Sequence, residues 1–254
     1  MARFLGPALV VSCTALLVLG CGGGVPLLHG AHVPSPGVTT TAVGFSGVFT
    51  TGELRDTVEK ARLANSASTG GNESSVVVAG VGPGVAPIFA MRIGLAGDNE
   101  VGLSYTGRTL RFDARHAFES GPWALSLGAG VNGSSGSVEL SEPSPDRTTG
   151  KTTALGFDVP VLFGWRSDAG VVTLWTGARA GYEQIDAASL ASRNLVHRYV
   201  GGLAGLAMGF RHVHIALALE TAFHDLKRPN SDTGVTVELQ GLTLTPAGGL
   251  LFTF

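Results

Sequence analysis

The chain closes with Leu242–Phe254, Leu-Thr-Leu-Thr-Pro-Ala-Gly-Gly-Leu-Leu-Phe-Thr-Phe, and this stretch decides the fold. Its large apolar residues share one parity, and most residues between them are small or polar: Leu242, Leu244, Leu250, Phe252 and Phe254. A period of two is typical of a β-strand with one apolar face. Because a chain terminus frays unless it is tied down, we expect this strand to close a barrel against the first strand.

The composition supports a barrel that crosses a membrane. Glycine accounts for 38 of the 254 residues, or about 15% against a usual ~7%, and only 14% are charged, against a usual ~25%. Mean hydropathy is +0.29, yet the body contains no apolar run near the ~20 residues that a membrane-spanning helix needs. Alternating lipid-facing and lumen-facing residues explain this combination. The net charge of −2 leaves no basic excess to bind nucleic acid.

The same alternation recurs along the body. Val38–Thr51 is expected to be the first strand and Val235–Phe254 the last. Apolar residues alternate with small or polar ones in eight further runs: 89–95, 101–105, 110–118, 123–131, 155–165, 172–182, 200–210 and 213–223. The total is about ten strands, within a range of eight to twelve.

Long and short connections mostly alternate between these strands. Short turns fall near residues 97, 120, 168 and 211, and polar excursions fall at 52–82, 132–153, 183–196 and 225–234. Helical spacing from Leu54 to Leu63 predicts a short helix in the first excursion. Bacterial barrels have short periplasmic turns and long outer loops, so both chain ends are expected on the periplasmic side.

The amino-terminal end has the pattern of an export signal. Arg3 precedes the apolar stretch Phe4–Leu19, which is too short for a membrane anchor. Val18-Leu19-Gly20-Cys21 resembles the cleavage box of bacterial lipoproteins, although Leu19 is bulkier than the usual residue there. The resemblance implies that Cys21 becomes the first mature residue and carries lipid, and Gly22 favours the outer membrane. Ordinary signal cleavage nearby is the alternative.

These patterns divide the chain into a signal peptide (1–20), a lipidated flexible tether rich in proline and glycine (21–37) and a barrel (38–254). The expected fold is an all-β, antiparallel transmembrane β-barrel of about ten strands. Through its alternation and terminal Phe254, the chain resembles the broad class of small Gram-negative outer-membrane proteins. The alternative fold is a soluble periplasmic ligand-binding barrel with its apolar face inward, because alternation alone does not say which face is inside.

Charged residues occur sparsely on the face opposite the apolar one. They are Arg92, Arg111, Asp113, Arg115, Glu119, Asp158, Arg166, Arg179 and Glu220. In a narrow lumen opposite charges should pair, since an unpaired buried charge is costly. Such residues either fill the lumen as a structural plug or line a narrow pore for a small solute.

The remaining motifs do not favour catalysis. His212, His214 and His224 lack a completing Cys or carboxylate cluster, so neither a metal nor another cofactor is expected. Gly128–Gly133 matches a dinucleotide fingerprint without the helix that should follow it. Ser126 and His214 could pair in a barrel-embedded lipid or peptide hydrolase, but a third orienting group is missing. We therefore expect a structural, narrow-pore or binding protein in contact with outer-membrane lipid, and not an enzyme.

Overall fold

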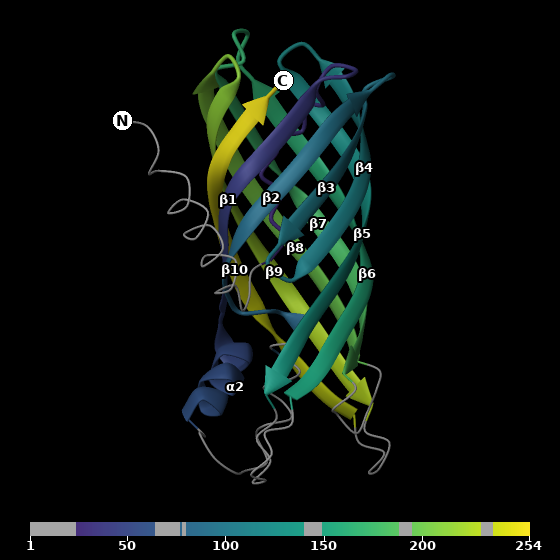
Figure 1. The fold of residues 1–254 in the computed structure, drawn as a ribbon, viewed down its shortest axis with the longest axis vertical. Helices are drawn as coiled ribbons and strands as arrows, with labels where there is room; N and C mark the ends of the chain where they lie inside the picture. Colours follow the sequence, from purple (N-terminus) through teal and green to yellow (C-terminus); the bar gives the residue numbers. More distant parts are fainter. Residues whose placement is uncertain (1–23, 64–76, 78–79, 140–148, 188–194, 230–235) are drawn as a thin grey trace, which may run out of the picture.

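The computed structural model describes residues 24–63, 77, 80–139, 149–187, 195–229 and 236–254 (Figure 1). The expected signal peptide and Cys21 lie outside these residues.

Ten antiparallel strands form a closed barrel in which each strand pairs with its neighbours along the chain and β1 pairs with β10. The strands are β1 (Thr39–Thr50), β2 (Gly84–Leu95), β3 (Asn99–Thr106), β4 (Thr109–Ser120), β5 (Trp123–Glu139), β6 (Thr149–Arg166), β7 (Val172–Ala187), β8 (Leu195–Phe210), β9 (Val213–Pro229) and β10 (Thr236–Thr253). The expected architecture and strand number are confirmed.

The carboxyl-terminal strand closes the ring, as the alternation of Leu242–Phe254 predicts. In this seam Thr41 pairs with Phe252 and Val43 with Leu250. Backbone hydrogen bonds continue to the last residue, because Thr39 N donates to Phe254 O at 3.1 Å and Phe254 N donates to Thr39 O at 2.9 Å. In Figure 1 the yellow end of β10 lies beside the purple start of β1. The closed ring leaves no free sheet edge.

Large apolar side chains point outward from the barrel. Leu217 is 52% exposed, and exposed Leu, Val, Ile and Phe residues occur on every strand from β1 to β10. Exposed aromatic rings gather near the short-turn end at Phe118, Trp123, Phe210 and Phe254, as in the aromatic girdles of membrane barrels. An apolar outer surface of this extent belongs in lipid, so the alternative of a soluble barrel with an inward apolar face is wrong.

The strands extend further than the alternation predicts. Residues 132–139, 149–153, 183–187 and 225–229, expected in polar excursions, belong to strands. About 9–11 tilted residues suffice to cross a bilayer, whereas β5 to β10 have 16 to 18 each. Beyond the lipid both faces of a strand meet water or polar neighbours. The alternation of apolar residues therefore stops there, while the backbone hydrogen bonds between neighbouring strands continue.

A helix and an apolar cluster cover the end of the barrel that carries the long connections. Helix α2 (Gly52–Leu63) confirms the predicted helix, and it lies at the lower end of Figure 1. Its Leu54 is buried with a set of aliphatic residues from the strand ends and the β1–β2 connection: Val48, Val77, Val81, Ile185, Leu195, Leu226 and Leu239. We call this set the cap cluster. Among the described residues, no helix is long and apolar enough to cross a membrane.

A charge on the outer face should destabilise the barrel according to its depth. Leu217 lies five residues into β9 from the short-turn end, near the middle of the expected lipid band. Leu217→Arg is expected to lower the free energy of unfolding in lipid vesicles by about 2–4 kcal/mol. Leu155, 72% exposed and nearer the long-connection end of β6, is the matched control. Leu155→Arg should lower it by about 1 kcal/mol or less. Equal losses would contradict this placement of the lipid band.

Candidate functional site

Residues 24–36 run through the barrel lumen, and we call them the plug segment. The sequence predicts a flexible tether here. The segment is extended, as its prolines and glycines favour, but it packs inside the barrel instead of lying free. It joins β1 through a turn in which Gly37 adopts φ of +82°, a value that favours glycine. Gly37 N donates to Gly94 O at 2.9 Å, which fixes the turn to the barrel wall.

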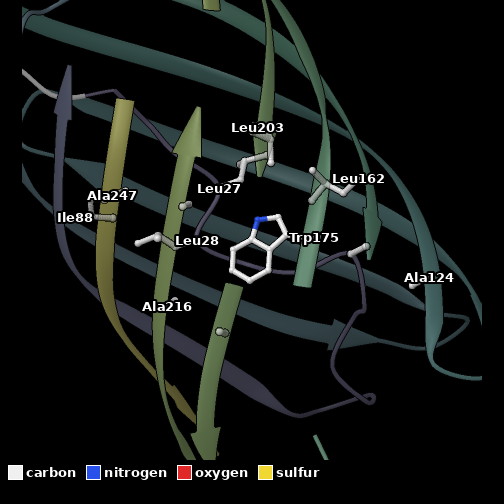
Figure 2. Close-up of a cluster of buried hydrophobic side chains, with 12 residues drawn as sticks. Leu27, Leu28, Ile88, Ala124, Leu162, Trp175, Leu203, Ala216 and Ala247 are labelled. Atoms are coloured by element: carbon white, nitrogen blue, oxygen red, sulfur yellow. The ribbon is translucent and has the colours of Figure 1, made fainter. Parts of the chain in front are cut away.

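Apolar side chains hold the middle of the plug segment (Figure 2). Leu27 is 3% exposed, Leu28 is 4% exposed and Ala31 is fully buried. The wall of this apolar clamp comes mainly from strands β5 to β10: Ala124, Leu162, Trp175, Leu203, Ala207, Ala216, Ala218 and Ala247, with Ile88 from β2. Many wall residues are alanines, which leave space that the two leucines fill. Full burial of a leucine side chain contributes about 1.5–3 kcal/mol.

Side chains of the barrel also bind the backbone of the plug segment. Arg115 donates through Nη1 to Gly30 O and through Nη2 to His32 O, the second bond at 2.9 Å. Arg179 Nη1 donates to Val25 O at 2.6 Å. Two further bonds join Ser46 Oγ to Gly24 O at 3.1 Å and Val33 N to Glu119 Oε1 at 3.1 Å. These bonds satisfy backbone groups that an extended segment cannot satisfy internally.

Six buried charges form an alternating ladder on the wall between β2 and β6. In order along the ladder they are Arg115, Glu100, Arg92, Asp113, Arg111 and Asp158. The guanidinium of Arg111 binds Asp158 through two hydrogen bonds of 2.7 Å each. Three cations and three anions cancel, so the ladder adds no net charge to the lumen.

Glycines on intervening strands make room for the ladder. Gly102 on β3 lies under the Arg92–Asp113 pair, and a Cβ there would stand 2.8 Å from Asp113 Oδ1. Gly130 on β5 lies under Arg111, whose Nη2 would be 2.6 Å from such a Cβ. Both distances are shorter than a Cβ atom can keep from a polar atom, so a larger residue at either position would clash with the ladder. The long side chains can therefore cross an intervening strand only where that strand carries glycine.

A polar chamber of about 70 Å³ lies where the plug segment meets the cap cluster. Gly24 and Val25 of the plug segment and Gly80 and Val81 of the β1–β2 connection are among its lining residues. Arg179 pairs with Glu220 there at 2.9 Å. Four buried polar atoms of chamber residues have no hydrogen-bond partner among the described residues: Asn132 Oδ1, Arg179 Nε, Glu220 Oε2 and Arg111 Nη1, the last of which lies in an ion pair with Asp113. The chamber is large enough for about two water molecules, which need such partners.

A row of hydrogen-bonded side chains lines the same chamber on strands β7 to β10. His197 Nδ1 lies 2.8 Å from Glu183 Oε2, His197 Nε2 lies 2.8 Å from His224 Nδ1, and His224 Nε2 lies 2.8 Å from Thr243 Oγ1. Two neutral imidazoles satisfy every bond if each donates toward Glu183 and Thr243 donates to His224. The row is thus a continuous chain of side-chain hydrogen bonds from β7 to β10.

The structure separates the nine lumen charges of the sequence prediction into two groups. Seven are buried in the ladder or the chamber. Glu119 and Arg166 instead lie partly exposed at the short-turn mouth, 3.6 Å apart. The hydrolase candidates do not meet in the described structure: Ser126 is buried on β5, and His214 Nε2 lies 3.1 Å from Gly170 O.

Sequence reasoning missed Glu100, Glu183 and His197. Each shares the inward parity of its strand, with Gly102, Arg179 and Tyr199 respectively. Glu100 lies between the predicted turn near residue 97 and the run 101–105, Glu183 lies in the predicted excursion 183–196, and His197 lies between that excursion and the run 200–210. Extending the inward parity into the polar strand ends identifies all three.

No protein-family model matches the sequence, and no curated protein does. The chain is similar in fold to the translocator domain of the autotransporter NalP from Neisseria meningitidis, with 11% identity and a TM-score of 0.46 over 97% of this chain and 95% of that one. It is also similar to the outer-membrane protease OmpT from Escherichia coli, with 8% identity and a TM-score of 0.43 over 86% and 97% of the two chains. Likeness at this level concerns barrel shape alone.

Breaking the ladder on one side should cost more than removing a whole pair. Arg111→Met leaves Asp158 buried without its partner and is expected to lower the free energy of unfolding by about 3–5 kcal/mol. Arg111→Met/Asp158→Leu removes both charges and should recover most of this loss. Denaturant unfolding in lipid vesicles measures both variants. A double variant less stable than Arg111→Met would show that the pair itself stabilises the barrel.

Proposed function

We propose that the protein is an outer-membrane β-barrel whose lumen is closed by its own plug segment, and that displacement of this segment opens a narrow polar pore. The observation that carries the proposal is the burial of Leu27, Leu28 and Ala31 inside the ring of strands. With the segment outside the barrel, the same wall would line a passage in which alanine and glycine leave space beside Leu162, Trp175 and Leu203. Whether the protein acts as the narrow pore expected from the sequence thus depends on whether the plug segment lies inside or outside the lumen.

The wall composition indicates which solutes would pass. The charge ladder is neutral as a whole, and Arg179 is balanced by Glu220. Rings of a single charge sign select strongly between anions and cations, and this lumen has none among its described residues. We therefore expect a pore for small polar solutes and ions with weak charge preference.

Charges placed on the buried leucines should expel the plug segment. Leu27→Asp/Leu28→Asp puts two carboxylates into an apolar clamp, where burying an unpaired charge is strongly unfavourable. In planar bilayers the parent chain, with Cys13 and Cys21 changed to Ala, should be closed. The Leu27→Asp/Leu28→Asp variant of that chain should show stepwise conductance. Gel mobility with and without boiling verifies that the variant is a folded barrel.

Two controls separate displacement from a general effect of charge. Ser35→Asp/Pro36→Asp adds the same charge at exposed positions of the same segment and should stay closed. Gly24→Cys/Thr245→Cys in the parent chain should form a disulfide, since a Cβ at Gly24 stands 3.1 Å from Thr245 Cγ2. Adding this disulfide to the Leu27→Asp/Leu28→Asp variant should suppress conductance until a reductant is added. A parent chain that conducts as much as the Leu27→Asp/Leu28→Asp variant would refute the plug.

The lipid anchor at Cys21 belongs to the same proposal. Cys21 precedes Gly24 by three residues, a reach of roughly 10 Å, and Gly24 lines the chamber inside the barrel. Acyl chains on Cys21 therefore reach the periplasmic leaflet only when the plug segment has left the lumen. Lipidation and closure compete for one segment.

This competition has a direct test. Mass spectrometry of the amino-terminal peptide from membrane-extracted protein should find acyl chains on Cys21, and this acylated protein should conduct in planar bilayers. The Cys21→Ala variant should stay closed. An acylated chain as closed as Cys21→Ala would rule out the competition, and a mature chain without lipid would rule out the anchor.

A further inference from the structure

The barrel recognises the plug segment mainly through main-chain atoms. Four carbonyl oxygens and one N–H, from Gly24 to Val33, bind side chains of β1, β4 and β7. None of these five bonds involves a side chain of the plug segment. Any extended peptide presents the same carbonyl and N–H groups at the same spacing.

Side-chain selection acts at buried positions of the segment, and three of these belong to the apolar clamp. Leu27 and Leu28 occupy the apolar clamp beside Trp175 and Leu203. At Ala31 the wall approaches so closely that a Cβ on Gly164 would lie 2.9 Å from Ala31 Cβ. The lumen thus accepts two adjacent aliphatic residues and, three positions after the second, a small residue.

The charge of the wall suits an uncharged peptide body. Arg115 is bonded to Glu100 and also donates to two plug carbonyls, and Arg179 is bonded to Glu220 and also donates to one. Neither arginine is left as a free cation for an anionic solute. Neutral carbonyl groups are the acceptors that match two already balanced guanidinium groups.

The chamber adds a feature that suits a peptide amino terminus. Glu220 is 4% exposed, its Oε2 has no hydrogen-bond partner among the described residues, and it lines the same chamber as Gly24. Asp158 and Glu183 line this chamber as well. An α-ammonium group at the position of Gly24 would supply a donor to the unbonded Glu220 oxygen and a positive charge among these carboxylates.

From these contacts we infer that the lumen is a binding channel for an extended, uncharged peptide with a free amino terminus, which enters from the short-turn mouth and takes the place of the plug segment. This inference rests on the proposed function, since the plug segment must be displaceable. Its ligand is a separate chain, bound by its backbone, with adjacent aliphatic residues in the apolar clamp and its amino terminus in the chamber.

The experiment adds a synthetic peptide of residues 24–36, labelled at its carboxyl end, to the reconstituted Leu27→Asp/Leu28→Asp chain. Fluorescence anisotropy should show saturable binding, and the unlabelled peptide should block the conductance of this variant. Acetylation of the peptide amino group should weaken binding about tenfold, the effect of losing one charge-assisted hydrogen bond. A peptide with Ala31→Phe should not bind, because the wall at Gly164 has no space for the ring.

A barrel variant tests the backbone contacts separately. Arg115→Met removes two bonds to plug carbonyls but leaves Glu100 paired with Arg92. It should weaken peptide binding at least about tenfold while the boiled and unboiled gel mobilities stay unchanged. A scrambled peptide of equal composition controls for non-specific adsorption.

The outcomes distinguish the two proposals. Conductance of Leu27→Asp/Leu28→Asp without peptide block or saturable binding would retain the plug and overturn the peptide channel. Equal binding of the free and acetylated peptides would overturn the place given to the amino terminus. No conductance in that variant would refute the proposed opening by displacement of the plug segment. If saturable peptide binding were also absent, the peptide channel would be overturned as well.

Discussion

A narrow barrel in lipid has to satisfy its polar groups from within. The outer surface is apolar, so nearly all polarity of the spanning strands is directed into a lumen that strand closure makes small. In that space a charge without a partner is far more costly than in water. The Arg115-to-Asp158 ladder, the row from Glu183 to Thr243 and the arginine bonds to the plug segment all meet this requirement.

Glycine is the means by which long side chains share this space. An inward glycine under Arg111 or between Arg92 and Asp113 lets a guanidinium reach a carboxylate two strands away. The inward glycines are therefore needed for the charged side chains to pair with one another. They also explain how charges on different strands form ion pairs: glycine on β3 and β5 lets Arg92 and Arg111 reach carboxylates on the strands beyond.

Much of the fold follows from local pattern. Period-two alternation and the terminal Phe254 predict the strand number and the seam, and the sparse charge of the opposing face favours an apolar face that points outward. The ends of the strands cannot be predicted in this way. Beyond the lipid the alternation of apolar residues stops, while hydrogen bonding between strands continues through residues such as 132–139.

The plug segment was missed for a different reason. Proline and glycine specify an extended chain, but whether Leu27 and Leu28 are buried depends on alanines of distant strands, which a single stretch cannot indicate. The inward charges could be assigned from parity, but their partners required the register of the strands.

The position of the plug segment in the chain bears on how the barrel is built. The segment immediately precedes β1, whereas the seam needs β10, the last strand to be synthesised. An open sheet with its inner face accessible can receive Leu27 and Leu28 by simple lateral packing. After closure the same residues have to pass end-on through a mouth lined by Arg92, Glu100 and Arg115. The more direct route is therefore that the plug segment packs on the inner face of the open sheet first. The sheet then curves around this segment until β1 pairs with β10.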